Sequence, residues 1–150
     1  MTGPSFRFRL ERVRTVRKHT EDVAAGHLLA ARLRAQESER DLELAQRRIE
    51  DARLAAVAAP RTPVSGAELA AMQVWLECAE RALATVAETH QRDEREVDAR
   101  RDELTVAARK RKALDRLEMR RRDEFDREAA RVESRTLDEI ALAPHGGRAA

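Results

Sequence analysis

Histidine and cysteine are the first side chains to consider for metal binding or for a base or nucleophile in this sequence. The four histidines are His19, His27, His90 and His145, and no two of them have the H-x-x-x-H spacing of a helical zinc site. We interpret His90 as a polar residue tolerated inside a helix–helix contact. Cys78 is the only cysteine, and we interpret it as a small residue beside the same contact.

The glycines do not form a phosphate-binding loop, because they lie far apart at positions 3, 26, 66, 146 and 147. A protein made of two long helices would also lack the concave pocket in which small substrates bind. We therefore expect a binding protein and not an enzyme, with no catalytic residue, no cofactor and no metal site.

The arginine and lysine side chains could bind acidic partners. Residues 7–18 contain six basic side chains against Glu11 alone, and residues 109–122 contain eight against Asp115 and Glu118. Such a surface attracts an acidic protein, a nucleic acid or an anionic lipid. The alternative is a solvated face neutralised by counterions, since the net charge of the whole chain is only +2.

The elements that must position these side chains are long helices. Charged residues make up 39% of the chain and aromatic residues 3%, with long runs of Ala, Arg, Glu and Leu, which is typical of coiled coils. Disorder is the competing interpretation of such a composition, but the apolar residues here are periodic. One cysteine permits no internal disulfide, and no apolar run is long enough to span a bilayer, so we expect a cytoplasmic protein.

Proline and glycine divide the chain into two predicted helices. The breakers gather in "APRTPVSG" and after residue 142, which predicts helices over about 6–58 and 67–142, a turn over about 59–66 and a flexible tail over 143–150. Ser65 and Glu68 have the spacing of a capping box at the start of the second helix. The short connection favours an antiparallel hairpin. The predicted fold class is all-α, a two-helix antiparallel coiled-coil hairpin forming a single domain over 1–150.

Both predicted helices carry apolar residues at alternating steps of three and four, the heptad pattern of a coiled coil. The first series is Leu28, Ala31, Ala35, Ser38, Leu42, Ala45, Ile49, Ala52 and Ala56. Upstream, Val13, Val16, Thr20 and Val23 keep these steps one residue out of phase, which predicts a local adjustment of the contact at Gly26. The second series is Leu69, Met72, Leu76, Ala79, Leu83, Val86, His90, Asp93, Val97, Arg100, Leu104, Ala107, Arg111, Leu114, Glu118, Arg121 and Phe125.

The second helix is the longer one and is expected to overhang the first. If the turn is centred near Arg61, Phe6 lies opposite about Arg116, and residues 117–143 have no partner on the first helix. An apolar face continues there through Phe125, Ala129, Val132, Thr136 and Ile140. Leaving apolar area in water is unfavourable by roughly 25 cal/mol per Å², so we expect a partner or a second copy to cover this face. Fraying of the helix in solution is the alternative.

Trp75 is the only tryptophan and lies near the turn, just off the heptad positions. An exposed tryptophan is a common anchor of a protein interface. The alternative is packing of the ring across the hairpin onto the alanine-rich side of the first helix.

Two stretches of the sequence resemble the flagellar FliJ family. The start, "FRFRLERVRTVRKHTEDVAAGHLLAA", is similar to the opening of those proteins, with aromatic residues and leucine before a charged helix. The closing stretch, "RKRKALDRLEMRRRDEFDREAARVESRTLDEIA", is similar to their ending, and "LDEIA" is its most telling part. The resemblance covers essentially the whole chain.

The resemblance implies a non-enzymatic component of the bacterial flagellar type III export apparatus, located in the cytoplasm and peripherally at the membrane of the flagellar base. Such a protein binds the hexameric export ATPase as a central-stalk-like rod, and contacts the export-gate membrane protein and substrate chaperones. By this resemblance the gate-facing residues would be Trp75 and Ala79. The ATPase-facing residues would be Arg116, Arg120, Arg121, Phe125, Val132, Leu137, Asp138, Glu139 and Ile140.

Two alternatives remain open from the residues alone. A stalk component of a virulence-type secretion system would have the same architecture. A nucleic-acid- or ribosome-associated coiled coil would use the basic residues, and its binding would fall steeply with salt. We expect no nucleic-acid partner, because acidic residues are interleaved with the basic ones and few aromatic residues accompany them. Self-association through the overhang is a further option.

Overall fold

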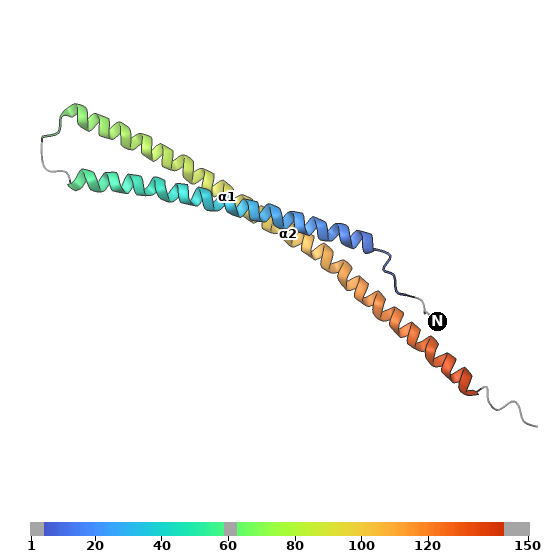
Figure 1. The fold of residues 1–150 in the computed structure, drawn as a ribbon. Coiled ribbons are helices and arrows are strands. Elements are labelled where there is room, and N and C mark those ends of the chain that lie inside the picture. The colour runs from blue at the N-terminus through green and yellow to red at the C-terminus, as the bar shows by residue number, and fades with distance from the viewer. Residues whose placement is uncertain (1–4, 59–62, 143–150) are drawn as a thin grey trace, which may run out of the picture. The chain divides into compact units, whose positions relative to one another are not determined.

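The structure, a computed structural model, describes residues 5–58 and 63–142 and consists of two helices (Figure 1). Helix α1 spans Glu11–Ala58 and helix α2 spans Gly66–Leu142. They pack antiparallel as the arms of a hairpin, which confirms the predicted all-α fold class. The predicted tail over 143–150 and most of the predicted turn lie outside the described residues.

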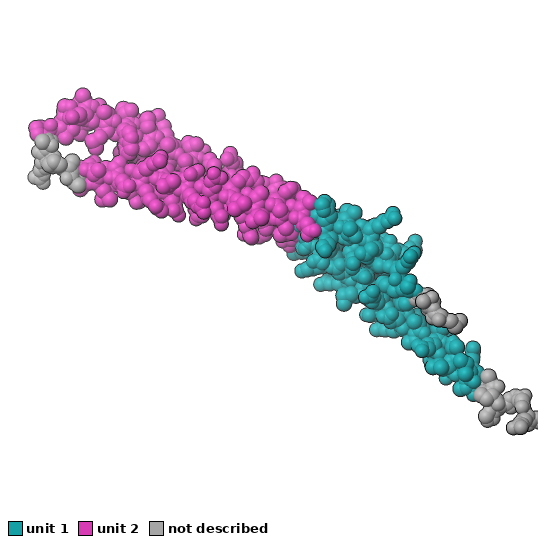
Figure 2. All heavy atoms as spheres, in the orientation of Figure 1, with its two compact units in different colours: residues 1–21, 106–150 teal, residues 22–105 magenta. Residues whose placement is uncertain are grey.

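The contacts group the chain into two units (Figure 2). The first, which we call the turn unit, comprises residues 22–105. The second, which we call the terminal unit, comprises residues 1–21 and 106–150. Each unit contains a part of both helices and is described below by itself.

The turn unit is held together by small apolar side chains at the predicted heptad positions. Leu28, Ala31, Ala35 and Val97 form its buried core, and Leu104 packs against them. Because alanine is so short, it lets two helix backbones approach closely, and Ala31 is only 1% exposed. On α2 the predicted series is buried or half-buried from Leu76 through Leu104, which confirms its register.

The two helices separate towards the turn (Figure 1). Ala56, Leu69 and Met72 were expected inside the contact, but all three are exposed. Val57, four residues along α1 from Arg53, is 86% exposed. The heptad pattern therefore continues in the sequence beyond the point where the helices still bury it.

The terminal unit continues the same contact with charged residues. On α1 the half-buried positions are Arg14, Arg17 and Glu21, and they continue the three- and four-residue steps that lead to Ala24 and Leu28. The predicted change of phase at Gly26 is therefore wrong. Val13, Val16, Thr20 and Val23 all point outward, because the inward positions next to them are filled by arginine and glutamate that form ion pairs with α2.

Helix α1 begins at Glu11, later than the predicted start near residue 6. Residues 5–8 are not helical, and the Glu11 amide donates a hydrogen bond to the Phe8 carbonyl at 3.2 Å, closing a turn before the helix. The Phe6 ring packs against the Phe125 ring of α2, with their centroids 5.7 Å apart. The alternating Phe6 and Phe8 side chains, both half-buried, thus belong to an extended segment.

Helix α2 begins with the predicted capping box. The Ser65 amide donates to the Glu68 carboxylate at 2.8 Å, and the Glu68 amide donates to the Ser65 hydroxyl at 3.3 Å. Two backbone N–H groups that an isolated helix start would leave unpaired are thereby satisfied. The hydrogen bond from the Ser65 backbone, and after it the one with the Ser65 side chain, lowers the pKa of Glu68.

Candidate partner-binding surfaces

Three ion pairs and one aromatic pair define how α1 and the segment before it are aligned with α2. In the terminal unit Arg14 pairs with Glu118, Glu21 pairs with Arg111, and Phe6 packs against Phe125. In the turn unit Arg53 pairs with Glu80 at 3.2 Å. The predicted alignment, with Phe6 opposite about Arg116, was wrong, because each of these pairs joins an α2 residue about ten positions further along than a turn centred near Arg61 would give.

The part of α2 without a partner is consequently shorter than expected, and we call residues 126–142 the overhang. Every residue of the overhang is exposed. Its apolar side chains include Val132 at 53% and Ile140 at 62% exposure. Leu137, Asp138 and Glu139, which the resemblance also assigned to the ATPase-facing part, lie in the same exposed segment.

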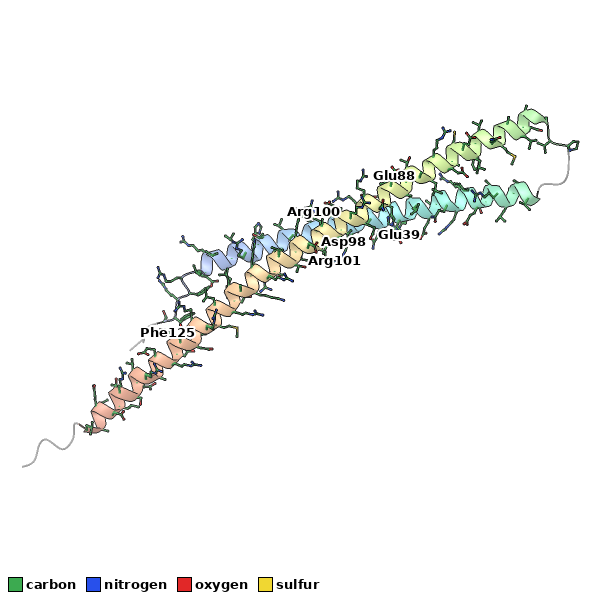
Figure 3. The ribbon with its side chains drawn as sticks, turned by 180° about the vertical axis from the view of Figure 1, so that it is seen from behind. Glu39, Glu88, Asp98, Arg100, Arg101 and Phe125 are labelled. Atoms are coloured by element: carbon green, nitrogen blue, oxygen red, sulfur yellow. The ribbon has the colours of Figure 1, made fainter. Side chains whose placement is uncertain are left out.

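Phe125 differs from the other residues assigned to that part. It is half-buried, and its ring lies against Phe6, over which the Arg122 guanidinium sits at 5.5 Å from the ring centroid. Figure 3 labels Phe125 at the place where the N-terminal segment meets α2. Because this residue already has a partner within the chain, the exposed apolar face begins after it and not at it.

The basic residues divide into those that form ion pairs and those that face solvent. Arg14 and Arg111 are half-buried, and hydrogen bonding to Glu21 is the main reason why the pKa of Arg111 is raised. Arg121 bonds to Glu124 at 3.1 Å. Arg116 and Arg120 are exposed and, among the residues that the structure describes, take part in no ion pair.

Along the turn unit, the charges of α2 are mostly paired within the helix. Arg100 bonds to Glu103 and to Glu96, which raises the pKa of Arg100, and Arg101 bonds to Asp98 at 3.1 Å. Figure 3 labels Arg100, Arg101 and Asp98 on this stretch. Such pairs three or four residues apart stabilise a helix without a partner, so this stretch carries no basic surface like that of the terminal unit.

The turn end carries an exposed apolar surface. Trp75 is 50% exposed and lines a shallow hollow together with Pro63, Val64, Glu68, Ala71 and Met72. The ring is therefore not packed across the hairpin onto α1. Ala79, the other residue assigned to the gate, is half-buried at a heptad position. Trp75 and its neighbours on the hollow thus form the accessible part of this surface.

The residues considered for chemistry lie apart. His90 is half-buried in the helix contact, where its Nδ1 lies 3.2 Å from the Ser38 hydroxyl, as expected of a polar residue tolerated there. Cys78 is exposed on α2. Across residues 5–58 and 63–142, no group of three or more His, Cys, Asp or Glu side chains is placed to hold a metal ion. Neither helix, over the same residues, has a stretch long and apolar enough to cross a membrane.

Sequence reasoning missed one surface. Val13 and Val16 are 42% and 62% exposed on the outside of α1, although their spacing had assigned them to the helix contact. The signal was present in the sequence, because Arg14, Arg17 and Glu21 complete the downstream heptad series without a break.

The fold and these surfaces define an antiparallel two-helix coiled-coil protein whose candidate functional features are exposed helix faces. A comparison with protein families matches residues 6–149 to the flagellar FliJ protein family, and the chain belongs to that family. Its members are non-catalytic, and membership makes this chain a flagellar component related to protein export. No match was found among curated proteins. No solved structure matched either.

Proposed function

We propose that this protein is the non-enzymatic stalk-like component of the flagellar type III export apparatus, which binds the ring of the export ATPase through its overhang. The observation that carries the proposal is the exposure of the whole segment 126–142, which follows the contact of Phe125 with Phe6. A helical end with an apolar stripe can enter an opening lined by several subunits. Membership of the FliJ family supports the same assignment.

The basic side chains next to the overhang extend this proposed surface. Arg116, Arg120 and Arg121 are exposed on the last turns of α2 that α1 still accompanies. They would steer the overhang towards an acidic surface of the ATPase, since clustered charge of one sign speeds the encounter with the opposite sign. Asp138 and Glu139 lie beyond them and would contact basic positions on the ATPase.

The turn end is proposed to contact the export gate. Trp75 supplies an exposed aromatic anchor, and the hollow beside it is lined by Val64, Ala71 and Met72. In this arrangement the ATPase and the gate bind different units of the chain. Substrate chaperones complete the proposed set of partners, and the protein would lie at the cytoplasmic side of the membrane at the flagellar base.

Substituting Ile140→Asp tests the ATPase contact. We expect its affinity for the purified export ATPase to fall by about tenfold or more, because covering one such side chain is worth roughly 1.5–3 kcal/mol. Ser134→Asp is the matched control, since it adds the same charge to the other side of the overhang. Isothermal titration calorimetry measures both affinities.

Unchanged affinity in Ile140→Asp would contradict the proposal, as would equal losses in the two variants. A gel-shift assay with duplex DNA and with RNA at about 150 mM salt separates the proposal from nucleic-acid binding, which phosphate contacts would make strongly salt-dependent. A shift in that assay would favour the nucleic-acid alternative.

A further inference from the structure

One side of the helix pair in the terminal unit carries apolar residues from both helices, and we call this side the groove. Thr15, Lys18 and Asp115 line a charged hollow on the opposite side. Residues two apart on a helix point to nearly opposite sides, since each residue turns the helix by about 100°. Val13 and Val16 on α1 and Leu117 on α2, each two residues from one of those three, therefore share the other side.

The groove is apolar along Val13, Val16 and Leu117 and basic at its edges. Val13 and Val16 are exposed, and Leu117 is half-buried beside Phe8, Leu10 and Phe125, with which it lines a second hollow. Arg12, Arg109 and Arg120 are exposed along its edges, and none of the three forms an ion pair within the described part of the chain. A helix that fits here needs an apolar stripe flanked by carboxylates.

The overhang has this pattern. Its stripe consists of Ala129, Val132, Thr136 and Ile140, with the three- and four-residue steps of a coiled coil. Glu128 and Glu139 precede the first and last members of the stripe and flank it on one side, while Glu133 follows Val132 and flanks it on the other. The arginines Arg127 and Arg131 fall on the far side of the helix, whereas Arg135, seven residues after Glu128, lies on the same side as Glu128 and Glu139. In total the overhang has five acidic and three basic residues, whereas residues 106–122 of α2 have two acidic and eight basic ones.

We propose that the occupant of the groove is the overhang of a second copy of this chain, in a two-fold symmetric dimer. The spacings agree, because Ala129, Val132 and Thr136 have the same steps as Val13, Val16 and Thr20. With these residues side by side, the overhang runs antiparallel to α2 of the other copy. Glu139 then lies beside the partner copy's arginine at position 109, and Glu128 beside the one at position 120.

The proposed arrangement is a closed dimer with two-fold symmetry. The overhang (126–142) and the stretch that it covers (106–122) have the same length, so the two copies exchange overhangs about an axis close to residue 124. Both Phe125 rings then lie near this axis. A contact in which the same patches meet on both copies ends at a dimer and does not grow into a filament.

Disulfide trapping tests the alignment. In a Cys78→Ser background, we mix a Val16→Cys variant with a Val132→Cys variant and oxidise them mildly. The proposal predicts a disulfide-linked heterodimer as the main product. Thr15→Cys replaces Val16→Cys in the control, because Thr15 is as exposed but lies on the charged side of α1. Equal yields of heterodimer from the two mixtures would overturn the proposal.

Sedimentation velocity of variants with reversed charges tests the proposed contacts between the overhang carboxylates and the arginines at the edges of the groove. Reversal of the overhang charges in Glu128→Arg/Glu139→Arg should weaken dimerisation by about tenfold or more, and adding Arg109→Glu/Arg120→Glu should restore it. Circular dichroism at 222 nm shows whether each variant keeps its helices. A natural chain that stays monomeric at all concentrations tested, or a reversal without effect, would refute the dimer. No other protein takes part, so this outcome is independent of binding to the ATPase.

Discussion

The two units of this molecule use one heptad geometry with different contents. In the turn unit Leu28, Ala31, Ala35 and Val97 meet by apolar burial, and the unit as a whole has 12 basic and 17 acidic residues. In the terminal unit Arg14, Glu21 and Arg111 occupy corresponding positions, and that unit has 18 basic and 11 acidic residues. The same type of helix contact can therefore be maintained by burial of apolar side chains or by ion pairs between the helices.

The different contents of the two contacts suggest different roles for the two units, stability for the turn unit and binding for the terminal unit. Apolar burial in the turn unit stabilises the hairpin and is not weakened by the electrostatic screening that salt brings. Charged contact positions in the terminal unit contribute less and depend on ionic strength, but they leave exposed valines and arginines on the outside. The terminal unit thus combines a charged internal contact with an outer face of exposed valines and arginines.

The largest effect should follow from placing a charge in the apolar contact. We expect Ala31→Asp to lower the free energy of unfolding by about 3 kcal/mol, because the carboxylate would be buried without a partner. Ala30→Asp is the matched control, since Ala30 is exposed and only helix propensity changes, at under about 1 kcal/mol. Urea unfolding followed by circular dichroism measures both. Similar losses in the two variants would show that the turn unit does not depend on apolar burial.

A smaller, salt-dependent effect should follow from breaking the charged contact. Arg111→Gln should lower the unfolding midpoint at low salt, because Glu21 and Asp115 both lose their cation. The difference from the natural chain should shrink at high salt, where the interaction is screened. A double-mutant cycle with Glu21→Gln isolates the coupling between the two side chains. A coupling of zero at low salt would mean that the terminal unit is not held by this pair.

The smallest effect should be local and should appear at the start of α2. The folded pKa of Glu68 lies below its ordinary value of 4.5, so the carboxylate stabilises the first turn above that pH, and this stabilisation is lost as the pH falls through the lower folded value. NMR titration should give a pKa for Glu68 that rises towards its ordinary value in Ser65→Ala. In Glu68→Gln, the hydrogen-exchange protection of the first-turn amides should no longer change with the titration of this carboxylate. The free energy of global unfolding should stay the same. An unaltered Glu68 titration in Ser65→Ala would contradict the role of the hydroxyl.

Much of the fold could be predicted because the apolar periodicity of the turn unit has few competing interpretations. The alternation from Leu28 to Ile49 and from Leu76 to Leu104 gave the contact directly, and Ser65 with Glu68 gave the start of α2. The same reasoning failed where apolar residues lie outside and charged residues lie inside, as with Val16 beside Arg17. Apolar pattern alone cannot identify an ion-paired contact, because the charges become informative only when the opposite helix is aligned.

The candidate surfaces were predicted unevenly for the same reason. The overhang follows from the greater length of α2, and the exposed Trp75 follows from its position off the heptad. The groove beside Val13 depends on knowing which side of α1 faces α2. Continuing the downstream heptad series to Arg14 would have indicated that side, and the pairs Arg14–Glu118 and Glu21–Arg111 establish it. The single domain over residues 1–150 stays a prediction, as do the residues that would contact the ATPase and the gate.

The two cross-helix ion pairs of the terminal unit also protect the hairpin against slippage. Heptad repeats tolerate a slide by seven residues, since apolar positions then meet apolar positions again. Arg14 and Glu21 are seven residues apart and opposite in sign, and so are their partners Glu118 and Arg111. A slide in one direction would bring Arg14 against Arg111, and a slide in the other would bring Glu21 against Glu118. Like charges would therefore repel in either misaligned hairpin, and only one pairing of the two helices leaves both arginines neutralised.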